Sequence, residues 1–203
     1  MKNIGLYFGT FNPIHVGHLV IANYMAYYTN LDEVWLIVSP QNPFKEKASM
    51  LNDYHRLSLV RVAVEENPKL KASNIEFDLP IPSYTINTLT YLKEKYPSHQ
   101  FGLIMGEDNL RTFHKWKNHD QIINEHFLYV YPRILTEQEK NEIPEDQSGN
   151  YLSSHEKVIY CDAPIMKISS SFIRKAIKEK KDVTYLLTSN VAKYVKEMHF
   201  YEK

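Results

Sequence analysis

The chain has 203 residues, of which 43% are hydrophobic and 24% are charged, and its formal net charge is +0. This composition excludes a disordered protein, and the charge balance excludes a global attraction to nucleic acid or an anionic membrane. A single cysteine, Cys161, excludes an internal disulfide framework and favours a reducing compartment. With no apolar run of membrane-spanning length and no signal-peptide pattern, the sequence predicts one domain, residues 1–203, in the cytoplasm.

The first predicted unit is a strand, a turn and a helix. An apolar run at Ile4–Phe8 predicts a buried strand, and a helix is predicted to begin near Gly17. Gly9, Asn12 and Pro13 lie between them and predict a turn. A strand that leads into a helix N-terminus is an anion site, because free backbone N–H groups and the positive end of the helix dipole meet the ligand.

Two histidines, His15 and His18, occupy this turn. Each ring can donate a hydrogen bond to a phosphate oxygen, and each is expected to become cationic at modest cost, because the unperturbed pKa is near neutrality. Zinc ligation is disfavoured, because no glutamate separates the histidines and no third ligand is evident. The alternative is a tight turn with two incidental histidines, but the pair beside Gly9 and Thr10 favours a functional site.

A second predicted strand, residues 33–39, runs into a loop at residues 40–45. In a parallel sheet this loop leaves the carboxyl edge, so Lys45 can reach a bound phosphate; the alternative is a solvated surface lysine. A helix follows at residues 53–66, with Asp53 as its expected N-cap, and then an extended segment at residues 71–78.

The middle of the chain repeats the alternation of helix and strand. The helix that opens at residues 83–89 has Ser83 or Thr85 as its expected cap. A buried strand at 101–105 then runs into a glycine turn at 106–110. The further predicted elements are a helix around 121–123, a strand at 127–131, a polar surface excursion at 136–150 and a strand at 157–161 that Cys161 helps to pack.

Serines precede an amphipathic helix at residues 168–177, so one of them is expected to cap it. Ser170 and Arg174 are four residues apart and share a helix face, which forms a second phosphate-binding arrangement; the alternative is a cap and a surface arginine. A last helix is predicted at residues 191–198.

The alternation of strands and helices predicts an α/β fold, a doubly wound Rossmann-like parallel sheet with helices on both faces. In such a sheet the histidine turn and the Ser170–Arg174 arrangement face one crevice at the carboxyl edge. A triphosphate is long enough to touch both sites. The chemistry this suggests is in-line attack on phosphorus, with the protein supplying position and charge rather than a nucleophile.

The segment Thr10–His18 resembles the (T/S)-x-x-x-H-x-G-H signature of the nucleotidylyltransferase superfamily. Over nearly its whole length the chain is similar to the bacterial nicotinate-nucleotide adenylyltransferases. The segments that carry this resemblance beyond the signature are Asn42–Lys45, Ser83–Leu89, Gly106–Asp108 with Phe113 and Trp116, Pro132–Arg133, and Ile168–Arg174. The resemblance implies transfer of the AMP part of ATP to nicotinic acid mononucleotide, with Mg²⁺, giving deamido-NAD and pyrophosphate without a covalent enzyme intermediate.

The resemblance also implies roles for residues. The catalytic set is His15, His18, Lys45 and Arg174, with His18 at the α-phosphate, Lys45 near the reacting centre and Arg174 at the β- and γ-phosphates. The ATP-binding set adds Gly9, Thr10, Phe11, Gly106, Asp108, Ile168, Ser169 and Ser170, with Gly106 and Asp108 on the adenosine part. The mononucleotide-binding set is Lys45, Ser83, Tyr84, Thr85, Trp116 and Arg133, in which Thr85 receives the pyridine carboxylate, Trp116 stacks on the ring and Arg133 faces the phosphate. No protein ligand for a metal is assigned.

The chain departs from the family pattern at a few positions. A second glycine is common where Phe8 stands, aspartate where Asn12 and Asn87 stand, and proline where Thr188 stands. An ionic role is therefore lost at the two asparagines. Pro132-Arg133 also lacks the usual Arg-Pro-Gly order.

Two other functions are left open by the sequence. The first is an adenylyltransferase for another acceptor, nicotinamide mononucleotide or phosphopantetheine. The second is a non-catalytic nucleotide sensor, which the joint presence of His15, His18, Lys45 and Arg174 disfavours. No nucleic-acid or membrane partner is expected, and a homo-oligomer is left open.

Overall fold

The computed structural model describes residues 1–40, 50–133, 152 and 154–202. Within these ranges six parallel strands form one sheet in the order β3-β2-β1-β4-β5-β6. The strands are β1 (Asn3–Gly9), β2 (Glu33–Val38), β3 (Leu70–Ser73), β4 (Gln100–Gly106), β5 (Leu128–Tyr131) and β6 (Val158–Tyr160). The order reverses between β1 and β4, so the crevice of a doubly wound sheet opens at the carboxyl ends of these two strands.

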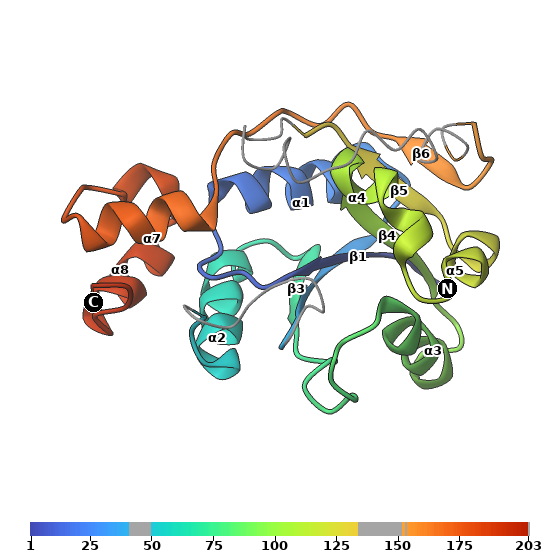
Figure 1. The fold of residues 1–203 in the computed structure, drawn as a ribbon, viewed down its shortest axis with the longest axis horizontal. Coiled ribbons are helices and arrows are strands. Elements are labelled where there is room, and N and C mark those ends of the chain that lie inside the picture. The colour runs from blue at the N-terminus through green and yellow to red at the C-terminus, as the bar shows by residue number, and fades with distance from the viewer. Residues whose placement is uncertain (41–49, 134–151, 153, 203) are drawn as a thin grey trace.

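Helices cover both faces of this sheet. They are α1 (Val16–Tyr28), α2 (Asp53–Val64), α3 (Thr85–Lys95), α4 (Glu107–Arg111), α5 (His119–Glu125), α7 (Ser170–Lys178) and α8 (Ser189–Glu197), with 3₁₀ turns at Phe113–Lys115 and Thr184–Leu186. Figure 1 shows α1 on one side of the sheet and α3 on the other, with α7 and α8 together at one end of the molecule. The predicted doubly wound α/β fold is confirmed.

The sheet separates two hydrophobic cores, and successive side chains along a strand point into one core and then the other. On β1, Ile4 and Leu6 enter the core shared with α3, α4 and α5, whereas Tyr7 enters the core shared with α1, α2, α7 and α8. This is the period-two pattern of a strand that is covered on both faces. Cys161 is buried in the second of these cores directly after β6, as predicted, and burial raises the pKa of its thiol to about 11.

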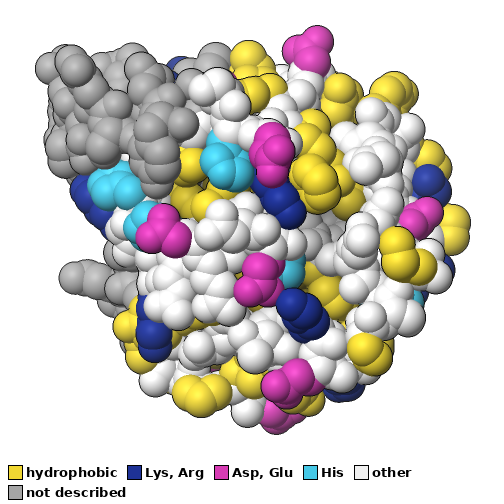
Figure 2. Space-filling view, turned by 90° about the vertical axis from the view of Figure 1, so that its right-hand side faces the viewer, with side chains coloured by type: hydrophobic (Ala, Val, Ile, Leu, Met, Phe, Trp, Pro, Cys, Tyr) yellow, Lys and Arg dark blue, Asp and Glu magenta, His cyan; other side chains and the backbone are white. Residues whose placement is uncertain are grey.

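The surface carries charges of both signs side by side. Figure 2 shows acidic and basic side chains interspersed with apolar ones on the face seen from the right-hand side of Figure 1. This distribution agrees with the formal net charge of +0. In the part of the chain that the structure describes, no helix has the length and apolar character needed to cross a membrane.

Two predictions about helix starts are wrong. The N-cap of α2 is Asn52, whose side chain accepts a hydrogen bond from the Tyr54 N–H, because the Asp53 carboxylate is held by Arg56 instead. The N-cap of α3 is Tyr84, whose side chain makes no capping hydrogen bond among the described residues, so neither Ser83 nor Thr85 is the N-cap. The hydroxyl oxygen of Ser83 is instead buried beside the helix start.

The extended segment predicted at residues 71–78 is too long. The strand β3 ends at Ser73, and residues 74–79 turn back on themselves through hydrogen bonds from the Phe77 N–H to the Asn74 carbonyl and from the Leu79 N–H to the Glu76 carbonyl. This turn buries the Glu76 side chain, which is 1% exposed. The predicted surface excursion at 136–150 lies outside the described residues.

Candidate active site

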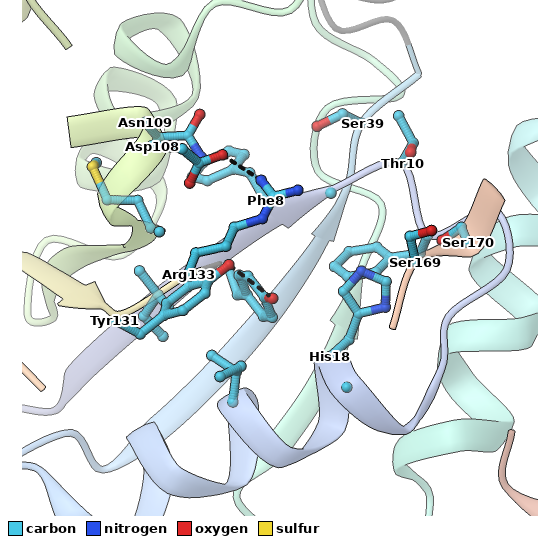
Figure 3. Close-up of a pocket in the computed structure, with 18 of the residues that line it drawn as sticks. Phe8, Thr10, His18, Ser39, Asp108, Asn109, Tyr131, Arg133, Ser169 and Ser170 are labelled. Atoms are coloured by element: carbon cyan, nitrogen blue, oxygen red, sulfur yellow. Dashed lines mark hydrogen bonds and ion pairs between the residues drawn. The ribbon is translucent and has the colours of Figure 1, made fainter. Parts of the chain in front are cut away.

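A cavity of about 780 Å³ lies at the carboxyl ends of β1 and β4. Every predicted site residue that the structure describes lines it: Gly9, Thr10, Phe11, His15, His18, Ser83, Tyr84, Thr85, Gly106, Asp108, Trp116, Arg133, Ile168, Ser169, Ser170 and Arg174. Figure 3 shows His18, Ser169 and Ser170 on one side of this cavity and Asp108 and Arg133 on the other. Lys45 lies outside the described residues.

The turn after β1 takes a shape that few residues adopt. Phe11 has a backbone φ of 45°, in the left-handed region, and its ring is buried against Gly9. A Cβ atom at position 9 would come within 2.8 Å of that ring. Gly9 is therefore needed at this point because the Phe11 ring occupies the space of a side chain.

Arg56 supports the turn from inside the protein and is fully buried. Its Nη1 donates hydrogen bonds to the carbonyl oxygens of Thr10 at 2.6 Å and Ser39 at 3.0 Å, and its Nε donates to that of Leu51 at 3.1 Å. Its Nη2 lies 2.7 Å from the Asp53 carboxylate. One side chain thus joins the end of β1, the end of β2 and the segment before α2.

The two histidine rings are stacked, with centroids 3.7 Å apart and planes at 24°. The backbone N–H of His15 donates to Nδ1 of His18 at 3.3 Å, so a neutral His18 ring carries its proton on Nε2. The edges of Phe11 and Tyr7 also contact the His18 ring, with centroids at 5.1 Å and 6.2 Å. His18 is therefore a fixed donor, which is what stabilisation of developing charge requires.

The expectation that both histidines charge easily is wrong for His15. This residue is 5% exposed, and burial lowers its pKa to about 4, so the ring is neutral near pH 7 in the absence of an anion. Its Nδ1 is buried with no hydrogen-bond partner among the described residues. A bound phosphate would supply both a partner for this ring and a negative charge that favours its protonation.

This burial predicts a pH dependence of stability. Unfolded His15 takes up a proton near pH 6.5 and folded His15 near pH 4, so the unfolded state binds more protons between these values. We expect the free energy of unfolding to fall as the pH is lowered through this window. Above pH 6.5, His15 should cause no further change of this free energy with pH. Urea unfolding of the native chain and of His15→Asn at several pH values checks this, since the variant should show the shallower slope. Equal slopes would contradict the assignment.

The start of α7 meets the β1–α1 turn although the two are far apart in the sequence. The Ser170 hydroxyl donates to the Pro13 carbonyl at 2.9 Å, and Nη1 of Arg174 donates to the Asn12 carbonyl at 2.8 Å. The Ser169 side chain accepts from the Phe172 N–H, so Ser169 is the predicted serine cap. The structure thus brings the two predicted phosphate-binding arrangements into one site.

The Asn12 amide has an additional role in this contact. Its Oδ1 accepts hydrogen bonds from the Tyr201 hydroxyl at 2.8 Å and the Leu51 N–H at 3.2 Å. Both donors are neutral, so the change from aspartate to asparagine at this position retains the acceptor that they need. The C-terminal segment is thereby fastened to the β1–α1 turn.

The far side of the cavity is formed by the ends of β4 and β5. Arg133 forms an ion pair with Asp108 through Oδ2, whereas Oδ1 of Asp108 is buried without a hydrogen-bond partner among the described residues. The hydroxyl groups of Tyr7 and Tyr131 lie 3.3 Å apart beside them. Arg133 therefore lies beside a residue predicted for adenosine, and both line the cavity that the predicted mononucleotide residues also line.

The start of α3 and the turn before α5 form a third wall. The half-buried Trp116 packs on Phe113, with ring centroids 5.3 Å apart, and also lines the cavity. Trp116 thus packs on the core and also offers a face to the cavity. Lys117 lies over the Tyr84 ring, with its Nζ atom 4.7 Å from the centroid.

Several residues of the site were not predicted from the sequence, namely Tyr7, Asn12, Ser39, Arg56, Glu76 and Tyr131. Arg56 had a local signal, because a single arginine on the otherwise apolar side of a predicted helix requires buried partners. Glu76 had none, since it stood within a segment that was predicted to be extended. Its position depends on the turn that follows β3.

Comparison with known proteins agrees with this geometry. Residues 6–176 match the family model described as "Cytidylyltransferase-like". A Flavobacterium johnsoniae protein named "Probable nicotinate-nucleotide adenylyltransferase" is 54% identical over 200 residues, which cover 98% of this chain and 99% of that protein. A protein of the same name from Flavobacterium psychrophilum is 53% identical over 200 residues, with the same two coverages. The chain belongs to the nicotinate-nucleotide adenylyltransferase family.

A solved structure shares the overall fold of this chain. The Plasmodium falciparum nicotinic acid mononucleotide adenylyltransferase complexed with NaAD superposes with a TM-score of 0.76 at 18% identity, covering 100% of this chain and 98% of that one. This likeness concerns the fold alone. The relatives confirm the family that the sequence predicted, and the solved structure agrees with the predicted fold.

Proposed function

We propose that this chain transfers the AMP part of ATP to nicotinic acid mononucleotide, giving deamido-NAD and pyrophosphate. Membership of the nicotinate-nucleotide adenylyltransferase family supports this activity. The observation that carries it is that one cavity, lined by described residues, holds the β1–α1 turn with its two histidines, the start of α3 and Trp116. These are sites for a triphosphate, an anionic acceptor group and a flat ring.

In this proposal the triphosphate lies between the β1–α1 turn and α7. The His18 ring donates to the α-phosphate, and Ser169, Ser170 and Arg174 hold the β- and γ-phosphates. The fixed stacking of His15 on His18 and the contacts of Arg174 with the turn support these roles. The buried Oδ1 of Asp108 is an acceptor suited to a ribose hydroxyl of the adenosine part.

The acceptor lies at the start of α3. The side chain of its N-cap residue, Tyr84, makes no capping hydrogen bond in the described structure, which leaves the first N–H groups and the positive dipole end for an anion. A pyridine carboxylate suits this position better than an uncharged amide, which favours the acid over nicotinamide mononucleotide. Trp116 lies in the same wall and offers a face for the pyridine ring.

The reaction is an in-line displacement. A phosphate oxygen of the mononucleotide attacks the α-phosphorus of ATP, the new P–O bond forms, and the bond to the β-phosphate breaks to release pyrophosphate. The attacking oxygen is already anionic, so no general base is needed. The protein contributes position and hydrogen-bond donors aimed at the charge that develops on the α-phosphate.

Mg²⁺ belongs to this proposal as a companion of ATP. In the ranges that the structure describes, no group of three His, Cys, Asp or Glu side chains is arranged to hold a metal ion. Oxygens of the ATP phosphates would supply ligands to the ion, as is common for Mg²⁺. When bound, Mg²⁺ neutralises charge on the triphosphate.

A panel of acceptors tests the proposal. We expect the purified chain with ATP and Mg²⁺ to release pyrophosphate with nicotinic acid mononucleotide, and more slowly with nicotinamide mononucleotide. Release with phosphopantetheine but not with either mononucleotide would show that the acceptor is wrong. ATP binding without release for any acceptor would favour a nucleotide sensor.

A further inference from the structure

The wall of the cavity contains a buried carboxyl group that has no role in the proposed reaction. Glu76 is 1% exposed and lines the cavity together with Ser39 at the end of β2 and Ser83 before α3. Its Oε1 accepts a hydrogen bond from the Thr88 hydroxyl at 2.7 Å. Thr88 is in the first turns of α3, so the carboxyl group is fastened to the helix at which the acceptor is proposed to bind.

Two polar atoms at this point lack hydrogen bonds in the described part of the chain. Both Oε2 of Glu76 and the hydroxyl oxygen of Ser83 are buried without a hydrogen-bond partner. They are complementary, because the hydroxyl can donate and the carboxyl oxygen can accept. Buried polar groups of this kind are nearly always satisfied, so an unsatisfied pair beside a ligand cavity requires an explanation.

The hydroxyl groups are close enough to act on the carboxyl group. Burial raises the pKa of Glu76, and the hydroxyls of Thr88, Ser39 and Ser83 oppose that rise. Ser83 thus lies near the carboxyl group, although its hydroxyl oxygen and Oε2 of Glu76 form no hydrogen bond in the structure. A small movement of residues 83–85 toward Glu76 would align it, and these are the residues that an acceptor at the start of α3 would contact.

We propose that Glu76 is a positioning residue for the acceptor, and that its Oε2 takes a hydrogen bond from Ser83 when the acceptor binds. The bond fixes the segment before α3 against the turn that follows β3. Thr88 holds the other carboxyl oxygen, so the group is already oriented. This inference rests on the proposed function, since it names the start of α3 as the acceptor site.

A double-mutant cycle on the acceptor KM tests the proposal. Glu76→Gln keeps the shape and an oxygen for Thr88 but places an amide NH₂ group where Oε2 accepts, and Ser83→Ala removes the donor. We expect each single variant to raise the KM for nicotinic acid mononucleotide about tenfold, the usual scale of one lost buried hydrogen bond. The double variant should be no worse than either single variant. The kcat and the KM for ATP should stay within about twofold.

Thr90→Val is the matched control, because its hydroxyl donates to the Ile86 carbonyl on the exposed side of the same helix. An unchanged acceptor KM in Glu76→Gln, or a double variant whose effect is the product of the two single effects, would overturn the proposal. So would a parallel loss of kcat and of ATP affinity, which indicates general damage to the fold. If Glu76→Gln does not fold, Thr88→Val should raise the acceptor KM and Thr88→Ser should not.

Failure of the proposed function gives a different result. In that case the unmodified chain forms no product with nicotinic acid mononucleotide. Failure of the Glu76 inference alone leaves the unmodified chain active, with the acceptor KM unaltered in the variants.

Discussion

Replacement of His18 by alanine is expected to lower kcat by about 10²–10³-fold, the usual cost of losing one donor that faces developing charge. The ring is held by a hydrogen bond from the His15 N–H and by stacking at 3.7 Å, so its Nε2–H points in a fixed direction before substrate arrives. A preorganised donor contributes more to the transition state than to the ground state. The loss should therefore appear in kcat, with little change in the KM for the mononucleotide. Steady-state kinetics with both substrates varied measure it.

His99→Ala is the matched control for this variant. His99 lies just before β4, at the edge of the sheet opposite the cavity, and its ring stacks on Tyr96. We expect kcat of this variant to stay within about twofold of the native value. An equal loss of kcat and of mononucleotide affinity in His18→Ala would show that the histidine only binds.

Replacement of Arg56 by methionine is expected to lower the free energy of unfolding by about 3–5 kcal/mol, the range for breaking a buried charge network. Methionine keeps much of the apolar stem, but the carbonyl oxygens of Thr10 and Ser39 lose their donors in a buried place. Such unsatisfied groups account for the size of the effect. Urea denaturation monitored by circular dichroism measures the loss, and the KM for ATP should rise because the β1–α1 turn, at which we propose that the triphosphate binds, is no longer fixed.

Arg61→Met is the corresponding control, since Arg61 lies on the exposed side of the same helix α2. Its effect should be within about 0.5 kcal/mol, as is usual for surface positions. A loss of less than about 1 kcal/mol in Arg56→Met would contradict the role given to this side chain, provided that the slope of the unfolding free energy against urea concentration is unchanged.

Local sequence patterns were enough to predict most of the fold. The apolar runs at Ile4–Phe8 and 101–105 are continuous because both faces of a parallel strand are buried. Their alternation with amphipathic segments then determines the doubly wound sheet. The prediction was wrong where the choice depends on contacts distant in the sequence. Asp53 looks like a cap, but the guanidinium group of Arg56 binds its carboxylate, and Asn52 caps the helix instead.

The candidate site also has parts that local sequence predicts and parts that depend on contacts distant in the sequence. Thr10–His18 carries fixed residue types at fixed spacing, so a turn suited to phosphate was predicted from that segment alone, and its binding role stays a prediction. The meeting of Arg174 with Asn12 was predictable only through the topology, because both lie at the carboxyl edge. Glu76 was not predictable, since the turn at residues 74–79 and the start of the helix that follows it create its surroundings. The low pKa of His15 depends likewise on burial, which the residue type does not reveal.

The fate of the α-phosphate tests the central claim most directly. The chain would be incubated with nicotinic acid mononucleotide, Mg²⁺ and ATP that carries a radioactive label at either the α- or the γ-phosphate, and the products separated. The account predicts that the α-label appears in deamido-NAD and the γ-label in pyrophosphate, with no label on the protein. Release of the γ-label as inorganic phosphate with formation of ADP, or an α-label retained covalently on the chain, would contradict it.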